Sequence, residues 1–160
     1  MSGSPPPIYT PEQRRRRDAS PWTQVQGVLA ALQFVIFLCS LGLVVRFLVT
    51  GDGAGVATAS VVTKTLVLYT IMVTGAIWER EVFGQYLFAK AFFWEDLVSM
   101  GVIALHTLYL YAWMSGSLSV VEQMYIAIAA YAAYMVNAGQ FLWKFRRARL
   151  TATFATAEAA

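Results

Sequence analysis

The stretch WTQVQGVLAALQFVIFLCSLGLVV (residues 22–45) decides the fold, because its 24 consecutive positions carry no charged residue. A helix needs roughly 20 apolar residues to cross the hydrocarbon core of a bilayer. A cleavable signal peptide has a shorter apolar stretch of about 7–15 residues, followed by a cleavage site of small residues. The length of the stretch therefore predicts a membrane anchor, and Pro21 stands where its helix can begin.

Three further apolar runs follow the first, at about 56–78, 92–114 and 120–143. Glycines within residues 51–55 mark the first loop, and the sequence SGS at 115–117 marks the third. The sequence therefore predicts an all-α integral membrane protein. Its architecture is expected to be a four-transmembrane-helix bundle with helices at about 22–48, 56–79, 92–114 and 120–145.

Both ends of the chain are polar and are predicted to lie outside this bundle. Residues 1–21 contain prolines, serines and four consecutive arginines, which indicate a mobile basic cytoplasmic tail. Residues 148–160 are expected to form a flexible C-terminal tail, so that the membrane domain covers residues 22–147. The connection at 80–91 is expected to lie in the membrane interface as a short amphipathic lid.

The composition favours a lipid environment and excludes several kinds of site. Of the 160 residues 58% are hydrophobic and 13% are charged, whereas soluble proteins have about 25% charged residues. Cys39 is the only cysteine, which excludes an intrachain disulfide, and it is expected to be a small buried apolar residue. The single histidine, His106, excludes a bis-histidine haem within one chain, and no CxxC or HExxH metal motif is present.

The distribution of Lys and Arg predicts the orientation of the bundle. If both termini are cytoplasmic, ten of the twelve Lys and Arg residues lie beside the inner ends of the helices, and only Arg46 and Lys64 lie outside. The positive-inside rule makes that split decisive. Lys64 is expected to extend to the outer face, since it stands 15 residues, or roughly 22 Å of helix, from Glu79. Each basic run adjoins an apolar segment, which favours a membrane surface over nucleic acid.

Polar residues inside a bilayer are costly, so their positions indicate function or helix packing. At 100° per residue, one face of the third helix holds Glu95, Ser99, His106, Tyr109 and Trp113, with Asp96 beside them. The other helices carry further polar sets, namely Gln26, Gln33 and Ser40 on the first and Tyr131, Tyr134, Asn137 and Gln140 on the fourth. Six residues fall at the cytoplasmic end or in that half of the membrane, which predicts a pocket that opens there: Gln26, Glu79, Glu95, Asp96, Asn137 and Gln140.

Each of these residues also has a purely structural interpretation. Glutamine and asparagine often join neighbouring helices by hydrogen bonds. Glu95 and Asp96 can cap a helix N-terminus in headgroup water, and His106 can be a satisfied packing histidine. Two adjacent carboxyl groups beside an apolar pocket instead favour a general acid, because desolvation and mutual repulsion keep one of them protonated. The combined pattern favours a membrane pocket that contains an acid.

Five stretches of the sequence carry a family resemblance, and they occur in order along nearly the whole chain. They are YTPEQRRRRD (9–18), MVTGAIWE (72–79), AFFWED (91–96), ALHT (104–107) and NAGQFLWKFRRAR (137–149). In these stretches the chain resembles the 2-vinyl bacteriochlorophyllide hydratases of phototrophic bacteria. The resemblance implies a lyase of bacteriochlorophyll biosynthesis that adds water to the C3 vinyl group of a magnesium chlorin and gives a 1-hydroxyethyl group.

The resemblance also implies the substrate, the cellular location and the partners of the protein. The substrate is expected to be a chlorophyllide-type pigment that carries its own magnesium, with no protein cofactor and no protein-bound metal. The expected location is the bacterial inner membrane, cytoplasmic or intracytoplasmic, as a multi-pass protein in the lipid bilayer. Other enzymes of bacteriochlorophyll synthesis are candidate partners, nucleic acid is not, and a homodimer is compatible with the short outer loops.

Catalytic roles are assigned here from the residues and not from the family. Glu95 is predicted to be the acid because it shares the face of His106, and Asp96 is the second choice. Glu79 or His106 is expected to orient the water, with ligation of the substrate magnesium as the alternative role of His106.

The remaining predicted residues bind the pigment. Arg80 or Lys90 is expected to meet its propionate. Aromatic and amide side chains are expected to flank the macrocycle, namely Phe92, Phe93, Trp94, Tyr131, Tyr134, Asn137 and Gln140. A non-catalytic tetrapyrrole carrier would use the same pocket, and only the paired carboxyl groups favour catalysis. A proton-coupled exporter is disfavoured because the acids lie at one end of the helices.

Overall fold

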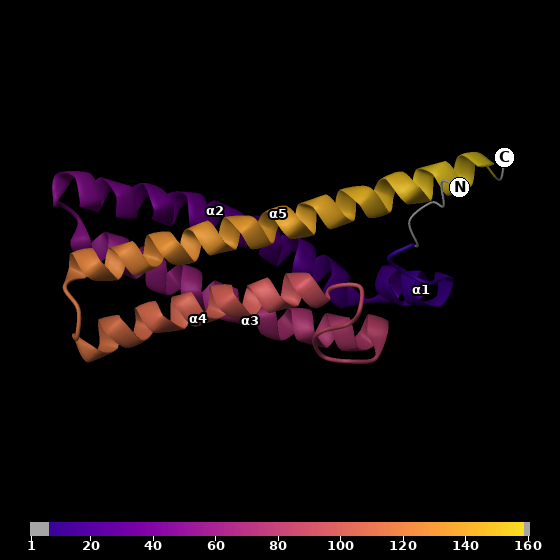
Figure 1. Ribbon diagram of the computed structural model, residues 1–160, viewed down its shortest axis with the longest axis horizontal. Helices are drawn as coiled ribbons and strands as arrows, with labels where there is room; N and C mark the ends of the chain where they lie inside the picture. Colours follow the sequence, from indigo (N-terminus) through magenta and orange to yellow (C-terminus); the bar gives the residue numbers. More distant parts are fainter. Residues whose placement is uncertain (1–6, 159–160) are drawn as a thin grey trace.

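The computed structural model describes residues 7–158, and within that range the chain is entirely helical apart from its loops (Figure 1). Its five helices are α1 (Pro11–Ala19), α2 (Pro21–Thr50), α3 (Ala54–Phe83), α4 (Phe93–Ser115) and α5 (Val120–Glu158). The four helices α2 to α5 are long and apolar enough to cross a membrane. The predicted number of long apolar helices is therefore confirmed.

Local sequence explains where the long helices begin and end. Helix α2 starts with Pro21 at its first position, and the Ser20 side chain accepts a hydrogen bond from the Trp22 backbone N–H. It ends at Gly51, whose φ of 78° is in the left-handed region. Helix α3 ends in the same way at Gly84, with a φ of 85°. These glycines let the chain turn sharply at both ends of α3.

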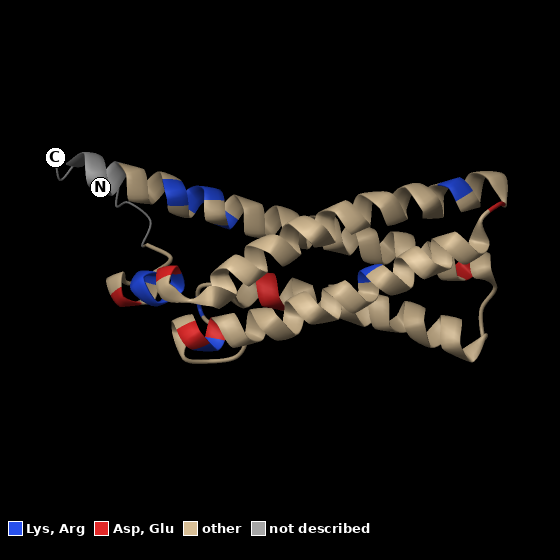
Figure 2. Ribbon diagram, turned by 180° about the vertical axis from the view of Figure 1, so that it is seen from behind, with Lys and Arg blue, Asp and Glu red and all other residues tan. Residues whose placement is uncertain are grey.

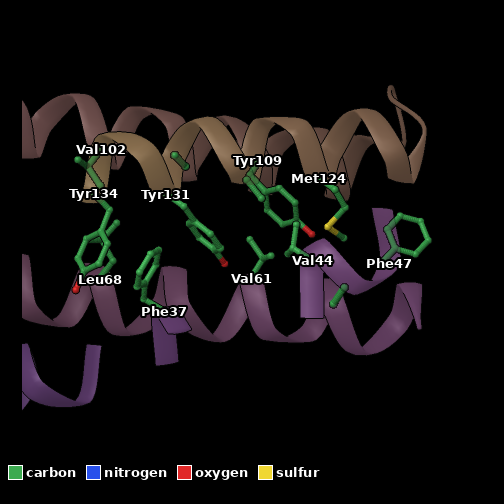
Figure 3. Packing of buried hydrophobic residues seen from close by; sticks show 13 residues of the cluster. Phe37, Val44, Phe47, Val61, Leu68, Val102, Tyr109, Met124, Tyr131 and Tyr134 are labelled. Carbon is green, nitrogen blue, oxygen red and sulfur yellow. The ribbon is translucent and has the colours of Figure 1, made fainter. Parts of the chain in front are cut away.

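The long helices pack as two antiparallel pairs, α2 with α3 and α4 with α5, and fewer contacts join one pair to the other. In the first pair the Gln26 amide donates to Thr74 at 2.6 Å, and the Ser40 hydroxyl lies 2.7 Å from that of Ser60. These two contacts fix the register of α2 against α3. Where the pairs meet, aromatic and aliphatic side chains form the main core (Figure 3).

Charged residues gather at one end of the bundle (Figure 2). This end, called the basic end below, contains α1, the loop from α3 to α4, and the last turns of α5. It includes the four arginines at 14–17 and the basic residues at 144–149. Along the sides of the bundle the exposed side chains are mostly apolar, as lipid contact requires.

The first and last segments differ from the prediction of mobile tails. Residues 11–19 form helix α1, because Thr10 and Gln13 complete a capping box. Helix α5 continues to Glu158 and does not end near residue 145. Residues 1–6 and 159–160, which also belong to the predicted tails, lie outside the described residues.

Two further expectations are corrected. Lys64 does not extend to the outer face but is fully buried between the two helix pairs, where its Nζ lies over the rings of Phe37, Tyr131 and Tyr134. Cys39 is exposed on the surface of α2 instead of buried, since the core-facing positions of that helix are Gln33, Phe37 and Ser40.

Helix α1 is held against the bundle by Tyr9. The ring of Tyr9 is 4% exposed and lies between Phe83 and Phe92, at centroid distances of 5.8 and 6.3 Å. The Arg17 guanidinium lies 4.7 Å from the centre of the same ring. Burial raises the pKa of the Tyr9 phenol, and the nearby Arg17 partly offsets the rise. Tyr9 therefore packs as a neutral aromatic anchor.

Removing this anchor should expose the arginines of α1. The Tyr9→Ala variant is expected to be cut by trypsin at residues 14–17 roughly tenfold faster than the wild type, since burial of an aromatic side chain contributes about 1.5–3 kcal/mol to the local closed state. The measurement is a cleavage time course in detergent. Tyr86→Ala is the matched control, because Tyr86 is exposed and contacts Arg80. Equal cleavage of both variants would show that Tyr9 does not hold α1.

Candidate functional site

A large cavity of about 1320 Å³ lies in the basic half of the bundle, between the two helix pairs. Sites for drug-sized ligands measure roughly 300–1,000 Å³, so this cavity accommodates a larger molecule. Its wall is mostly apolar and includes small residues on α2 and α3, among them Gly27, Ala30, Gly75 and Ala76. Gly75 packs closely against Gln26, because a Cβ there would lie 3.3 Å from the Gln26 side-chain oxygen. The small residues leave room for a flat apolar ligand.

Two carboxyl groups from different helices meet at the wall of this cavity. Glu79 stands near the end of α3 and Asp96 in the first turn of α4, and both are buried and line the cavity. Their carboxyl groups are close enough to interact with each other. Two carboxylates offer only acceptors, so a hydrogen bond between them requires that one of the two is protonated. The pair therefore has the composition of a general acid next to its conjugate base.

The loop from α3 to α4 fixes both carboxyl groups through backbone donors. The N–H of Phe88 donates to Asp96 Oδ2 and the N–H of Ala89 donates to Glu79 Oε1, each at 2.8 Å. Phe88 has a φ of 61°, in the left-handed region that a non-glycine residue seldom adopts. A strained residue of this kind persists where its surroundings fix it, and such residues cluster at functional sites.

Glu95, the acid predicted first from the sequence, occupies a different place. Its carboxylate forms an ion pair with Lys144 at 2.6 Å and does not line the cavity. Lys144 also donates to the Ala91 carbonyl, and the Asn137 amide donates to the Glu95 carbonyl at 2.9 Å. Glu95 thus joins α4 to α5.

His106 also lies away from the cavity. Its side chain is fully buried, and its Nδ1 is 2.8 Å from the Val102 carbonyl oxygen, which fixes the proton on Nδ1. Its Nε2 has no hydrogen-bond partner among the described residues. Because His106 is not part of the cavity wall, this arrangement does not bring it to the water or to a magnesium ion in the cavity.

The predicted pigment-binding residues are divided by the structure. Phe92, Tyr134 and Asn137 line the cavity. Tyr131 lies in the core, with its hydroxyl beside Ser40. The other predicted residues are also absent from the cavity wall, namely Arg80, Lys90, Phe93, Trp94 and Gln140.

The sequence analysis missed the basic residues at the mouth of the cavity. Arg14 and Arg17 of α1 and Arg147 and Arg149 of α5 line it there. Arg14 and Arg17 belong to the predicted mobile N-terminal tail. Arg147 is the last residue of the predicted membrane domain, and Arg149 belongs to the predicted C-terminal tail. The capping-box spacing of Thr10 and Gln13 was the signal that could have placed α1. Among the described residues no group of three or more His, Cys, Asp or Glu side chains could hold a metal ion.

Comparison with known proteins connects this site to one family. The family model for 2-vinyl bacteriochlorophyllide hydratase matches residues 9–147. The chain belongs to the 2-vinyl bacteriochlorophyllide hydratase family. It is 66% identical to the protein of that name from Rhodobacter capsulatus, over 91% of this chain and 84% of the relative. It is also 66% identical to the one from Cereibacter sphaeroides, over 89% of each chain.

The hydratase family match covers the carboxyl pair and most of the cavity wall. It begins at Tyr9 and ends at Arg147, so it contains the two carboxyl groups, the loop that fixes them and the docking residue of α1. No solved structure matches the chain.

Proposed function

We propose that this protein hydrates the vinyl group of a bacteriochlorophyllide, with Glu79 and Asp96 as the proton donor and acceptor. The observation that carries the proposal is the contact between these two carboxyl groups at the wall of a large apolar cavity. Family membership supports the reaction, and the geometry supports the choice of residues. The pair replaces Glu95 as the candidate acid.

The proposed mechanism returns the pair to its starting state. The shared proton passes to the terminal carbon of the vinyl group, and the conjugated macrocycle delocalises the resulting cation. Water adds at the inner carbon, and the carboxylate accepts the proton that the added water releases. One molecule of water is consumed, and the number of protons on Glu79 and Asp96 is unchanged. General acid–base catalysis of this kind typically contributes 10²- to 10⁴-fold.

The arginines at the cavity mouth give the pigment an orientation. A free propionate is an anion, and guanidinium groups bind carboxylates by charge-assisted hydrogen bonds. Arg17 and Arg147 come from α1 and α5, so the propionate is proposed to lie where these helices meet the cavity. This assignment replaces Arg80 and Lys90, which do not line the cavity.

The protein is proposed to work as a multi-pass protein of the bacterial inner membrane, with both termini cytoplasmic. The four apolar helices and the gathering of Lys and Arg at one end support this arrangement. The basic end and the mouth of the cavity then face the cytoplasm, which supplies the water. The proposal includes no protein cofactor, because the pigment brings its own magnesium.

The test is hydration of a 3-vinyl magnesium chlorin in ¹⁸O-labelled water by the purified protein in detergent, without nucleotide. Mass spectrometry of the extracted pigment is expected to show one added labelled water. The Asp96→Asn variant serves as the matched inactive control. Pigment that binds to the wild type and stays unchanged would contradict the proposal and favour a tetrapyrrole carrier.

A further inference from the structure

The side-chain amide of Gln26 is held in one orientation at the wall of the cavity. Its nitrogen donates to the Thr74 hydroxyl at 2.6 Å, and that hydroxyl donates in turn to the Thr70 carbonyl at 2.8 Å. A hydroxyl has one proton, so Thr74 can only accept from Gln26, and the NH₂ group of the amide must face it. The amide oxygen of Gln26 therefore faces away from Thr74.

This oxygen lies against a glycine of the neighbouring helix. A Cβ on Gly75 would be 3.3 Å from it, and Gly75 and Gln26 both line the cavity. Within the part of the chain that the structure describes, no side chain or backbone N–H donates to the oxygen. An acceptor at an apolar wall without a donor favours a ligand that supplies a donor or a cation.

The central magnesium of a chlorin is a cation of this kind. The four ring nitrogens occupy its equatorial positions, and an axial position stays open to a ligand above the plane. Magnesium is a hard cation for which carbonyl and carboxylate oxygens are suitable ligands. Because Gly75 contributes no side chain beside the Gln26 oxygen, the face of a flat macrocycle can approach this oxygen.

The place of Gln26 relative to the carboxyl pair fits the size of the macrocycle. Gly75 and Glu79 are four residues apart, so they lie on one face of α3 and roughly 6 Å apart along its axis. The vinyl group of a chlorin is at the rim of the ring, a similar distance from the magnesium. Vinyl and propionate are carried by neighbouring pyrroles, so a vinyl group at Glu79 leaves the propionate on the edge that faces Arg17 and the cavity mouth.

The other amide side chains of the cavity wall do not meet these conditions. Gln33 has an unpaired amide, but it stands seven residues after Gln26, or roughly 10 Å further from the basic end. It is therefore too far from Glu79 to reach the centre of the same macrocycle. The side-chain oxygen of Asn137 already accepts a hydrogen bond from Ser99 at 3.1 Å.

We infer that Gln26 is the axial ligand of the substrate magnesium, through its side-chain oxygen, and that it selects pigments that carry the metal. The inference rests on the proposed function, since the vinyl position at the carboxyl pair sets where the magnesium lies. Gln26 binds and positions the pigment and takes no part in proton transfer. By holding the centre of the macrocycle, it sets how far the vinyl group extends toward Glu79 and Asp96.

The test compares two pigments, the 3-vinyl magnesium chlorin and its metal-free counterpart with two protons in place of the magnesium. Affinities for both are measured by titration in detergent with the full-length wild type and with Gln26→Leu. Gln33→Leu is the matched control, because it removes a second glutamine of α2 that lines the cavity. Infrared difference spectra of wild-type protein with ¹³C at the glutamine side-chain carbonyls give a second readout that needs no variant.

Wild-type protein and Gln33→Leu are expected to bind the magnesium pigment roughly tenfold more tightly than the metal-free one, and Gln26→Leu is expected to bind the two alike. A labelled carbonyl should shift in frequency only with the magnesium pigment. A metal preference that Gln26→Leu retains, or a carbonyl that responds equally to both pigments, would overturn the inference and assign the axial position to water. A metal preference that depends on Gln26 in a protein that does not hydrate the vinyl group would instead contradict the proposed function.

Discussion

Replacing Asp96 by asparagine is expected to slow hydration by roughly 10²- to 10⁴-fold and to leave pigment binding within a few fold of the wild type. Asparagine keeps the size of the side chain, and its amide oxygen can still accept the hydrogen bond from the Phe88 N–H. It cannot carry the acidic proton that the proposed mechanism shares between Asp96 and Glu79. The measurement is a single-turnover rate from labelled water, with pigment affinity determined separately by titration. Glu79→Gln is expected to show the same loss.

The matched control for this prediction is Glu95→Gln, on the same helix turn. Glu95 pairs with Lys144 outside the cavity, so its replacement should affect stability and change the rate of the folded protein by only a few fold. The opposite pattern, with an inactive Glu95→Gln and an active Asp96→Asn, would return the acid to Glu95. This comparison separates the two carboxyl groups that are adjacent in sequence and differ in surroundings.

Replacing Lys144 by methionine is expected to lower the free energy of unfolding by about 3 kcal/mol, because it leaves the buried Glu95 carboxylate without its cation. Lys144 also donates to the Ala91 carbonyl, so the change removes a link from α5 to the start of α4. For a chain of this length, a loss of 1 kcal/mol lowers the melting temperature by roughly 2–4 °C. The expected decrease is therefore on the order of 10 °C, measured by thermal unfolding in detergent.

Two further variants test the cause of this decrease. The double variant Lys144→Met with Glu95→Gln is expected to recover most of the lost stability, since it leaves no unpaired charge. Arg146→Met removes an exposed cation from the same helix and should change the free energy of unfolding by at most about 0.5 kcal/mol. If Lys144→Met and the double variant have the same melting temperature, the ion pair is not the source of the stability.

The helices could be predicted from the sequence because each apolar run is long and its ends carry turn residues. Pro21 and Gly51 bound α2 in both the sequence pattern and the structure. Likewise, the convergence of polar residues at one end could be predicted from helical periodicity. Such patterns depend only on the position of a residue along its own helix.

The division of roles between the carboxyl groups could not be predicted, because it depends on contacts between helices. Glu95 and Asp96 point in directions about 100° apart on α4. Which of them faces the cavity is set by where α5 brings Lys144 and where α3 brings Glu79. The burial of Lys64 and the docking of α1 through Tyr9 are also interhelix packing, and no periodicity within one segment encodes them.

The short connection from α3 to α4 is the covalent joint between the two helix pairs, and its backbone amides of Phe88 and Ala89 hold the two carboxyl groups. The cavity lies between the same two pairs. Any hinge motion that spreads the pairs to exchange pigment must pass through this joint and disturb the spacing of Glu79 and Asp96. Such a motion would take the acid apart while the pairs are spread and would assemble it again when the bundle closes.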